Sequence, residues 1–322
     1  MNSTFRSETT GDEVVAAFPD SVKGRIFVVT GPSPKGIGAS GLIALAKAHP
    51  RALVLAGRTP SAFASVAQQI SSIDPAIHVV SVALDLSSLA SVRAAATELL
   101  ANADIPHIDV LINNAGVMAC PYSLTVDGIE MQFGTNHIGH FLFTSLLMPK
   151  LLKASEPRVV NLSSSGHRLG RLEQYEDYNW EKTPYNAWSA YGQSKLANVL
   201  FTNELAKRFG PRGLKAYSVH PGSVATDLLR HITEDRQHER TELITLVQSD
   251  PDWESMRRKN LEDGCSTTLV AALTPASALE NGSYLADCQV GNPKATTKNT
   301  EAAEKLWALS EKLVGEKFYA TV

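Results

Sequence analysis

Tyr191 and Lys195 are the side chains best suited to acid–base chemistry. They are four residues apart in a stretch with helical spacing of apolar residues, Ala190 to Phe209, so both would project from one face of a helix. A free tyrosine has a pKa of about 10, too high for efficient proton transfer at neutral pH. A neighbouring ammonium group lowers that pKa because it favours the phenolate. The pair predicts proton transfer at this helix, although the YxxxK pattern alone is frequent by chance.

A glycine-rich loop follows the first strand-like segment of the chain. The apolar, β-branched run Arg25 to Thr30 ends at Gly31, and Gly36 and Gly38 precede a helical stretch from Ala39 to Ala48. Glycines at this position let the backbone approach a pyrophosphate, and the helix N-terminus offers N–H groups and a positive dipole end. We therefore expect a dinucleotide site rather than an idle turn. The spacing differs from GxGxxG, so the loop must have a shape of its own.

Two cations flank this predicted dinucleotide site. The second strand-like run, Ala52 to Ala56, is followed by Gly57-Arg58, and no carboxylate stands there to bond the ribose 2′-hydroxyl of NAD. Lys35 adds a positive charge within the glycine loop. The two cations favour NADPH, whose 2′-phosphate an arginine can accommodate. The alternative is that Arg58 and Lys35 are ordinary solvated surface charges.

Strand-like and helical segments alternate along most of the chain. The expected strands are Arg25–Thr30, Ala52–Ala56, His78–Leu84, Asp109–Asn113, Arg158–Leu162, Leu214–His220 and Gly282–Leu285. The expected helices are Ala39–Ala48, Ser61–Ile70, Ser91–Leu100, a long one within Gly128–Lys153, and Ala190–Phe209. This alternation predicts an α/β fold, a doubly wound (Rossmann) parallel sheet with helices on both faces, in a single domain.

The domain is expected to span residues 23–322, preceded by a flexible N-terminal segment, residues 1–22. Two regions, 166–188 and 227–264, break the alternation. Both follow the carboxyl ends of strands, where open α/β sheets bind ligands, and long loops there are commonly functional. We expect 227–264 to form a substrate loop or lid.

Several motifs stand in one order along the chain. Asn113-Asn114-Ala115-Gly116, Asn136 and the serines after Leu162 lie between the glycine loop and Tyr191-Gly192-Gln193-Ser194-Lys195. With these motifs the sequence resembles the short-chain dehydrogenase/reductase family from about Lys23 to Asp287. Within that family, Asn113 to Phe143 and Ser194 to Asn198 are similar to the branch of retinol dehydrogenases and WW-domain oxidoreductases.

The resemblance implies four catalytic residues. Tyr191 would be the general acid in reduction and the general base in oxidation, and Lys195 would lower its pKa and hold the nicotinamide ribose. Ser164 would bond the substrate oxygen, with Ser163 and Ser165 as the alternatives. Asn136 would support a water-mediated proton path to Lys195.

The resemblance also implies the cofactor-binding residues. Asp85 would contact the adenine, Asn114 the adenine ribose, and the segment from Pro221 to Thr226 the nicotinamide carboxamide. The full set is Gly31, Ser33, Lys35, Gly36, Ile37, Gly38, Arg58, Asp85, Asn114, Ala115, Gly116, Tyr191, Lys195, Pro221, Gly222, Val224 and Thr226. The family loop is TGxxxGxG, whereas four residues separate Gly31 from Gly36, so the loop carries one extra residue.

Composition excludes other classes of function. The 322 residues carry a net charge of −3 with no basic block, which argues against nucleic acid binding. No stretch has the length and apolarity of a signal peptide or membrane span. The three cysteines are far apart, so we expect no disulfide framework and a cytoplasmic protein. His137, His140 and His220 lack partners at ligand spacing, so no metal site is expected. The sequence leaves a homo-oligomer open.

These observations predict an enzyme that uses NADPH to transfer a hydride to or from a small-to-medium hydrophobic carbonyl or alcohol. Secondary metabolism is the expected context of this reaction. One alternative is a non-catalytic NADP-binding sensor or scaffold, since fold does not dictate function. Another is an enzyme with the same residues that reduces an activated C=C bond or epimerises its substrate.

Overall fold

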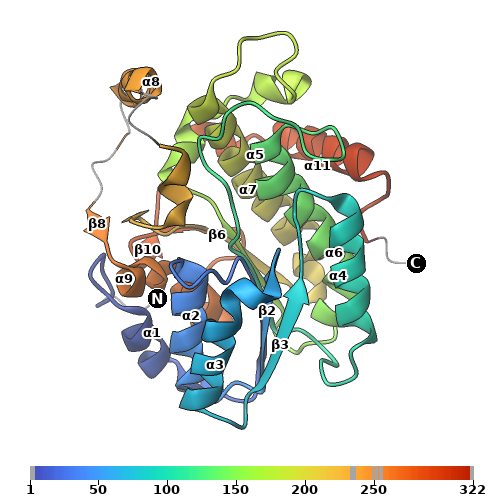
Figure 1. The fold of residues 1–322 in the computed structure, drawn as a ribbon, viewed down its shortest axis with the longest axis vertical. Coiled ribbons are helices and arrows are strands. Elements are labelled where there is room, and N and C mark those ends of the chain that lie inside the picture. The colour runs from blue at the N-terminus through green and yellow to red at the C-terminus, as the bar shows by residue number, and fades with distance from the viewer. Residues whose placement is uncertain (1–3, 233–236, 249, 251–252, 254–256, 320–322) are drawn as a thin grey trace.

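The central sheet has eight strands in the order β10-β9-β6-β5-β4-β1-β2-β3 (Figure 1). The structure is a computed structural model that describes residues 4–232, 237–248, 250, 253 and 257–319. Neighbouring strands are parallel except for the antiparallel pair β9–β10. The strands are β1 (Ile26–Thr30), β2 (Ala52–Gly57), β3 (His78–Ala83), β4 (Val110–Asn113), β5 (Arg158–Leu162), β6 (Lys215–His220), β9 (Tyr284–Ala286) and β10 (Gln289–Val290).

Helices cover both faces of this sheet. One face carries α1 (Gly11–Ala17), α2 (Ile37–Ala46), α3 (Ala64–Ile73) and α10 (Ser266–Leu273), and the other carries α4 (Leu89–Ala101), α6 (Gly139–Leu151), α7 (Ala187–Phe209) and α11 (Thr300–Val314). Strand β1 divides its side chains between the two cores: Ile26 and Val28 pack into one, and Phe27 and Val29 into the other. The expected doubly wound sheet in one domain is confirmed.

Strand order reverses between β1 and β4, which are direct neighbours in the sheet. β2 and β3 extend the sheet to one side of this pair, and β5 and β6 extend it to the other. The loops that leave β1 and β4 therefore diverge and open a crevice beyond their carboxyl ends, where ligands bind in such sheets. The glycine loop and the Asn114–Gly116 segment lie at that crevice.

The N-terminal segment differs from the expectation of a flexible residues 1–22. Residues Gly11–Ala17 form α1, and Thr10 and Glu13 make a capping box at its start. Val14 and Val22 are fully buried, and Phe5 is almost so. Apolar burial against α2 and α10 holds the described part of this segment to the domain. The polar residues around these few apolar ones concealed the helix in the sequence.

The single long helix expected within Gly128–Lys153 is interrupted. A short helix α5 (Met131–Phe133) leads into a π-helical turn, Gly134–Ile138, and α6 follows. Such π turns widen a helix locally and are frequent at functional sites. Asn136 lies within this turn.

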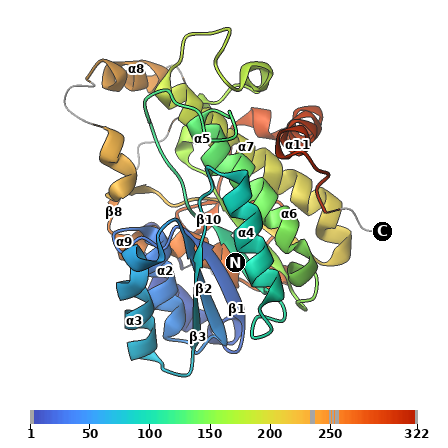
Figure 2. The ribbon, with the colours of Figure 1, turned by 45° about the vertical axis from the view of Figure 1, so that its right-hand side comes forward.

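The two irregular regions both contain short helices. Residues 166–188 include 3₁₀ turns at Ser165–Leu169 and Leu172–Asp177. In 227–264 the structure describes a 3₁₀ turn (Asp227–His231), α8 (Gln237–Gln248), β8 (Arg258–Lys259) and α9 (Leu261–Gly264), and the intervening residues 233–236, 249, 251–252 and 254–256 lie outside the described part. Figure 2 shows α8 on the same side of the molecule as the carboxyl ends of the strands.

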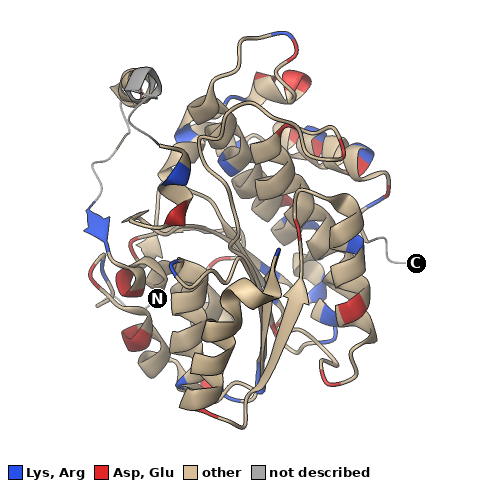
Figure 3. Cartoon of the chain, viewed as in Figure 1, with Lys and Arg blue, Asp and Glu red and all other residues tan. Residues whose placement is uncertain are grey.

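Acidic and basic residues are interspersed along the described part of the chain (Figure 3). None of the described helices is long and apolar enough to cross a bilayer.

Candidate active site

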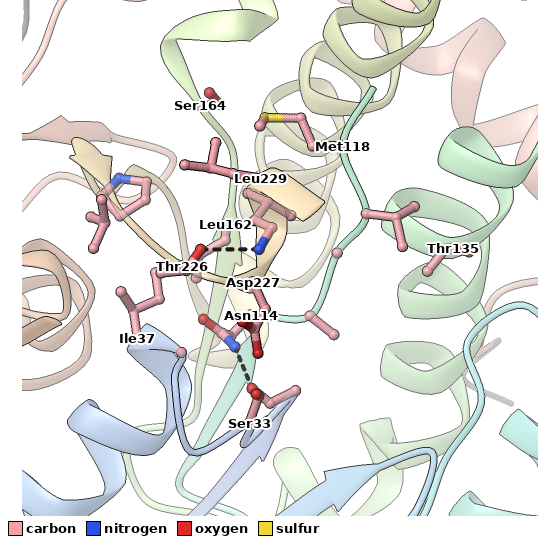
Figure 4. Close-up of a pocket in the computed structure, with 18 of the residues that line it drawn as sticks. Ser33, Ile37, Asn114, Met118, Thr135, Leu162, Ser164, Thr226, Asp227 and Leu229 are labelled. Carbon is pink, nitrogen blue, oxygen red and sulfur yellow. Dashed lines mark hydrogen bonds between the residues drawn. The ribbon is translucent and has the colours of Figure 1, made fainter. Parts of the chain in front are cut away.

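A cavity of about 800 Å³ lies beyond the carboxyl ends of the parallel strands. Almost all residues predicted from the sequence for the site line it: Gly31, Ser33, Lys35, Gly36, Ile37, Arg58, Asp85, Asn114, Ala115, Gly116, Ser164, Tyr191, Lys195, Pro221, Gly222, Val224 and Thr226. Figure 4 shows Ser33 and Asn114 toward one end and Ser164 and Met118 toward the other. Asn136 and Gly38 lie behind the cavity wall rather than on it.

The glycine loop is held by very close backbone contacts. Gly31 has a φ of +71°, and a Cβ atom there would lie 2.8 Å from the Cα of Ala115. The Asn114 side chain donates from Nδ2 to the carbonyl oxygens of Thr30 (2.8 Å) and Gly31 (3.1 Å). The N–H of Gly36 bonds the carbonyl of Ser33, so a tight turn accommodates the extra residue of the loop. Asn114 therefore ties the loop to the end of β4.

Gly38 lies at the closest of these contacts although it does not face the cavity. A Cβ there would stand 2.5 Å from Asn114 Nδ2 and 2.7 Å from the Gly31 carbonyl oxygen. Gly38→Ala should therefore displace the Asn114 amide and open the loop. We expect at least about tenfold weaker NADPH binding by fluorescence titration, from loss of hydrogen bonds worth about 1 kcal/mol each.

The control for that variant is Gly24→Ala, since a Cβ atom at Gly24 would meet nothing within 4 Å and the residue has a positive φ, so it reports backbone strain without a clash. If Gly38→Ala bound NADPH as tightly as the native chain, this account of the loop would be wrong.

Two cations and a carboxylate lie at the loop end of the cavity. Arg58 and Lys35 are both exposed, and in the part of the chain that is described neither forms an ion pair. Asp85 accepts from both the N–H and the hydroxyl of Ser87, at 2.9 and 2.6 Å, which fixes its carboxylate. A Cβ at Gly57 would meet the Phe63 ring at 2.9 Å, so the strand end leaves no room for a side chain there.

Tyr191, Lys195 and Ser164 converge at the opposite end. Tyr191 and Lys195 are both 4% exposed. Lys195 Nζ donates to the Leu162 carbonyl at 3.0 Å, a bond drawn in Figure 4, and lies 5.7 Å from the centroid of the Tyr191 ring. Gly166 allows this packing, because a Cβ there would lie 3.0 Å from Cε1 of Tyr191 and 3.4 Å from Ser164 Oγ.

The neighbouring serines have different surroundings. Ser163 donates its hydroxyl to the Lys195 carbonyl at 2.9 Å, which joins the end of β5 to α7. Ser164 lies close enough to Tyr191 for its hydroxyl to act on the pKa of the phenol. This placement favours Ser164 over Ser163 as the residue that meets a substrate oxygen.

Burial dominates the electrostatics of the pair. Desolvation raises the pKa of Tyr191 to about 12, and the Ser164 hydroxyl opposes this shift. Desolvation also lowers the pKa of Lys195 to about 8. The sequence-based expectation was that Lys195 lowers the pKa of Tyr191. In the structure the pKa of Tyr191 is raised instead, because burial disfavours the phenolate, and the phenol is protonated at neutral pH.

Asn136 holds the Val117 backbone from behind the cavity. Its Oδ1 accepts from the Val117 N–H at 2.8 Å, and its Nδ2 donates to the Val117 carbonyl and to Ser194 Oγ, both at 2.9 Å. A Cβ at Gly116 would lie 3.1 Å from Asn136 Oδ1 and 3.5 Å from Lys195 Nζ. The asparagine thus joins the β4 loop to the helix that carries Lys195.

The Pro221–Thr226 segment is supported by a residue that sequence reasoning missed. Ser223–Val224 forms β7, which pairs with β8. Gly222 has a φ of +98°, and a Cβ there would lie 2.7 Å from Cδ of Lys259. Lys259 is buried and pairs with Asp287 at 2.6 Å. No motif in the sequence points to this lysine, because its partner lies on a turn 28 positions away.

The walls near Tyr191 are largely apolar. Met118, Leu169 and Trp188 form a cluster with Tyr191, and Leu228, Leu243 and Trp253 of the expected lid pack against it and line the cavity. Two other aromatic residues of the segment 166–188, Trp180 and Tyr185, do not line the cavity; their ring centroids lie 5.5 Å apart, and Tyr185 packs against the cluster. Among the described residues, no three potential metal ligands gather at one place.

The family model for the short chain dehydrogenases matches residues 25–237, and the chain belongs to that family. It is 41% identical to human retinol dehydrogenase 11 over 292 residues, which are 91% of this chain and 86% of that protein. The structure of an uncharacterized protein from Mycobacterium paratuberculosis is similar with a TM-score of 0.72 and 34% identity, covering 94% of this chain and 98% of that one. The NADP complex of RhlG from Pseudomonas aeruginosa has a TM-score of 0.57 and 26% identity over 82% of this chain and 94% of its own. The chain is an oxidoreductase of the retinol dehydrogenase-like group.

Proposed function

We propose that this protein reduces a hydrophobic ketone or aldehyde, or oxidises the corresponding alcohol, with NADP(H). The observation that carries the proposal is the convergence of Ser164, Tyr191 and Lys195 at one end of a cavity whose other end is a glycine loop flanked by two cations. The residues fit a dinucleotide: the loop has no space for Cβ atoms at Gly31 or Gly38, and the N-terminus of α2 points toward it. When bound, the cofactor supplies or accepts the hydride.

The chain's own side chains would handle the proton. The Ser164 hydroxyl donates a hydrogen bond to the substrate oxygen, and the Tyr191 phenol, close to Ser164, gives its proton to that oxygen as reduction proceeds. The Lys195 ammonium stabilises the phenolate that remains. In oxidation the same phenolate takes the proton back. The apolar cluster of Met118, Leu169 and Trp188 would exclude water from this end.

NADPH rather than NADH is the proposed partner because Arg58 and Lys35 border the loop end of the cavity without an ion-pair partner in the described residues. The NADP complex of RhlG, similar in fold and 26% identical, supports this choice. Arg58→Ala should weaken NADPH binding by roughly ten- to a hundred-fold, since a charge-assisted hydrogen bond is worth roughly 1.5–3 kcal/mol. NADH binding should change by less than about twofold, because NADH has no 2′-phosphate for Arg58 to bind.

Titration of both cofactors with each variant measures this selectivity. Arg51→Ala is the matched control. Arg51 is an exposed arginine that directly precedes β2, the strand that Arg58 follows, and it does not line the cavity. An equal loss for NADH and NADPH would contradict the assignment of Arg58 to the 2′-phosphate.

Turnover separates the leading function from its alternatives. We expect NADPH oxidation with members of a panel of apolar ketones and aldehydes. Tight NADPH binding with no turnover on any carbonyl, alkene or sugar substrate would support a sensor or scaffold instead. The same proposal includes two further predictions. Residues 227–264 act as a lid over the substrate, and the protein is cytoplasmic, which is consistent with its three buried free cysteines. The link to secondary metabolism stays a prediction, tested by the genes that neighbour this one.

A further inference from the structure

His140 lies between the cofactor loop and the catalytic end of the site, and no role has yet been given to it. The residue is on α6, four positions after Asn136, and is 1% exposed. Its Nε2 lies 2.9 Å from the hydroxyl oxygen of Thr30, at the end of β1. Its Nδ1 lies 2.9 Å from the backbone carbonyl oxygen of Asn136. One imidazole therefore joins the β1 end of the glycine loop to the π turn.

The surrounding hydrogen bonds fix which nitrogen carries the proton. A carbonyl oxygen can only accept, so Nδ1 must be the N–H donor to Asn136. Thr30 Oγ1 already accepts the N–H groups of Asn114 (2.9 Å) and Ala115 (3.0 Å), which uses both of its lone pairs. Its own proton is then donated to Nε2 of His140. Every polar atom in this chain of bonds is satisfied by one tautomer, the neutral Nδ1–H form.

We infer that His140 is a positioning residue, locked as the neutral Nδ1–H tautomer. It fixes the position of the Asn136 carbonyl relative to the glycine loop, in the part of the site where Lys195 lies. This inference rests on the proposed function for its kinetic consequence, whereas the tautomer can be tested without turnover. Because the His140 imidazole is rigid and bonds to both, it couples the position of the glycine loop to the position of the π turn.

The charge state of His140 matters because His140 and Lys195 interact electrostatically. Burial lowers its pKa to about 4, the Asn136 carbonyl raises it, and Lys195 lowers it further. The electrostatic interaction with Lys195 is mutual, so a positive charge on His140 would disfavour the Lys195 ammonium. The neighbouring His137 also has a pKa of about 3 because of burial and is neutral. Neither histidine therefore adds a positive charge beside Lys195.

The first test is the tautomer of His140 in the native protein, read from long-range ¹H–¹⁵N correlation spectra without and with NADPH. His140→Gln identifies the resonance by its loss. We expect a protonated Nδ1 and an unprotonated Nε2 that do not titrate between pH 5.5 and about 9. A protonated Nε2, or a titration near the ordinary histidine pKa, would overturn the inference whatever reaction the enzyme performs.

The second test separates the two hydrogen bonds of the ring. The side-chain amide of His140→Asn can occupy the place of Nδ1 and donate to Asn136, whereas that of His140→Gln reaches the place of Nε2 and Thr30. His140→Phe keeps the ring and loses both bonds. We expect His140→Phe to lower kcat by roughly tenfold at saturating NADPH, consistent with an unsatisfied buried acceptor. His140→Asn should recover kcat to within about threefold, and His140→Gln should recover only the affinity for NADPH.

The outcomes distinguish this inference from the proposed function. If the native protein turns over no carbonyl, the proposed function fails, and the tautomer decides the inference alone. If the native protein is active and His140→Phe keeps its kcat, or His140→Asn is as slow as His140→Phe, the coupling to Asn136 is wrong. Thermal unfolding of each variant shows that the comparison is made between folded proteins.

Discussion

Replacing Tyr191 by phenylalanine should reduce turnover by about 10²–10⁴-fold while NADPH binding stays close to that of the native chain. The phenol is the group placed to donate a proton at the catalytic end of the cavity, and it is protonated at neutral pH, since its ordinary pKa is already high and burial raises it to about 12. Phenylalanine preserves the ring that packs with Met118, Leu169 and Trp188. The variant should therefore fold normally and lose only the proton donor.

Stopped-flow or steady-state NADPH oxidation measures the loss, and fluorescence titration measures cofactor binding. Tyr175→Phe is the matched control: Tyr175 is also buried, its hydroxyl lies 3.4 Å from the Gln193 carbonyl, and it does not line the cavity. Turnover by Tyr191→Phe within a few-fold of the native rate would remove Tyr191 from the proton-transfer step.

Replacing Lys195 by glutamine should lower kcat on the order of 100-fold, as expected for removal of a preorganised charge beside the developing phenolate. The same lysine should set the pH dependence of the native enzyme. Its pKa is lowered to about 8, so it is charged below that pH and neutral above it. The value of kcat/KM for NADPH, which reports the free enzyme, should therefore fall as the pH rises through about 8.

The pH profile of Lys195→Gln should lack this alkaline limb. Lys207→Gln is the control on the same helix, since Lys207 is exposed and pairs with Glu304 and Glu204. Both the size of the loss in kcat and the pH profile are needed, because loss of packing alone would lower the rate without removing the alkaline limb of the profile. An unchanged alkaline limb in Lys195→Gln would show that another group titrates there.

The centre of the sheet was predictable because its strands are continuous apolar runs buried on both faces. Strands such as Ile26–Thr30 and Ala52–Gly57 carry their own signal, and the residues that follow them lie at the crevice by topology alone. The elements that escaped prediction depend on tertiary contacts. Helix α1 is stabilised by a few valines packed on α2 and α10, and β10 has only two residues.

The site was predictable where its residues belong to motifs and not where they act through contacts. Tyr191 and Lys195 could be named from their spacing and Ser164 from the family resemblance, and the structure brings the three together. Gly38 was named as a cofactor contact, yet its effect passes through Asn114. Neither Lys259 nor the hydrogen-bonding role of His140 could be read from the sequence, since their partners come from distant segments.

The substrate end of the cavity was the least predictable part. Trp188 lines it and Trp180 does not, although both belong to the same aromatic segment. The difference is made by the local backbone, since Trp180 has a φ of +57° in a turn whereas Trp188 belongs to the first turn of α7. Aromatic composition alone carries no information on which ring faces a pocket.

The most direct test of hydride transfer to a carbonyl is the fate of the label from NADPH deuterated at C4 of the nicotinamide. The purified native protein is incubated with the labelled cofactor and an apolar ketone that it consumes, and the product is analysed by mass spectrometry and NMR. We predict one deuterium on the carbinol carbon of the alcohol and none elsewhere. Deuterium on a carbon that was part of a C=C bond, or an unlabelled epimer, would contradict the account and assign the site to another reaction.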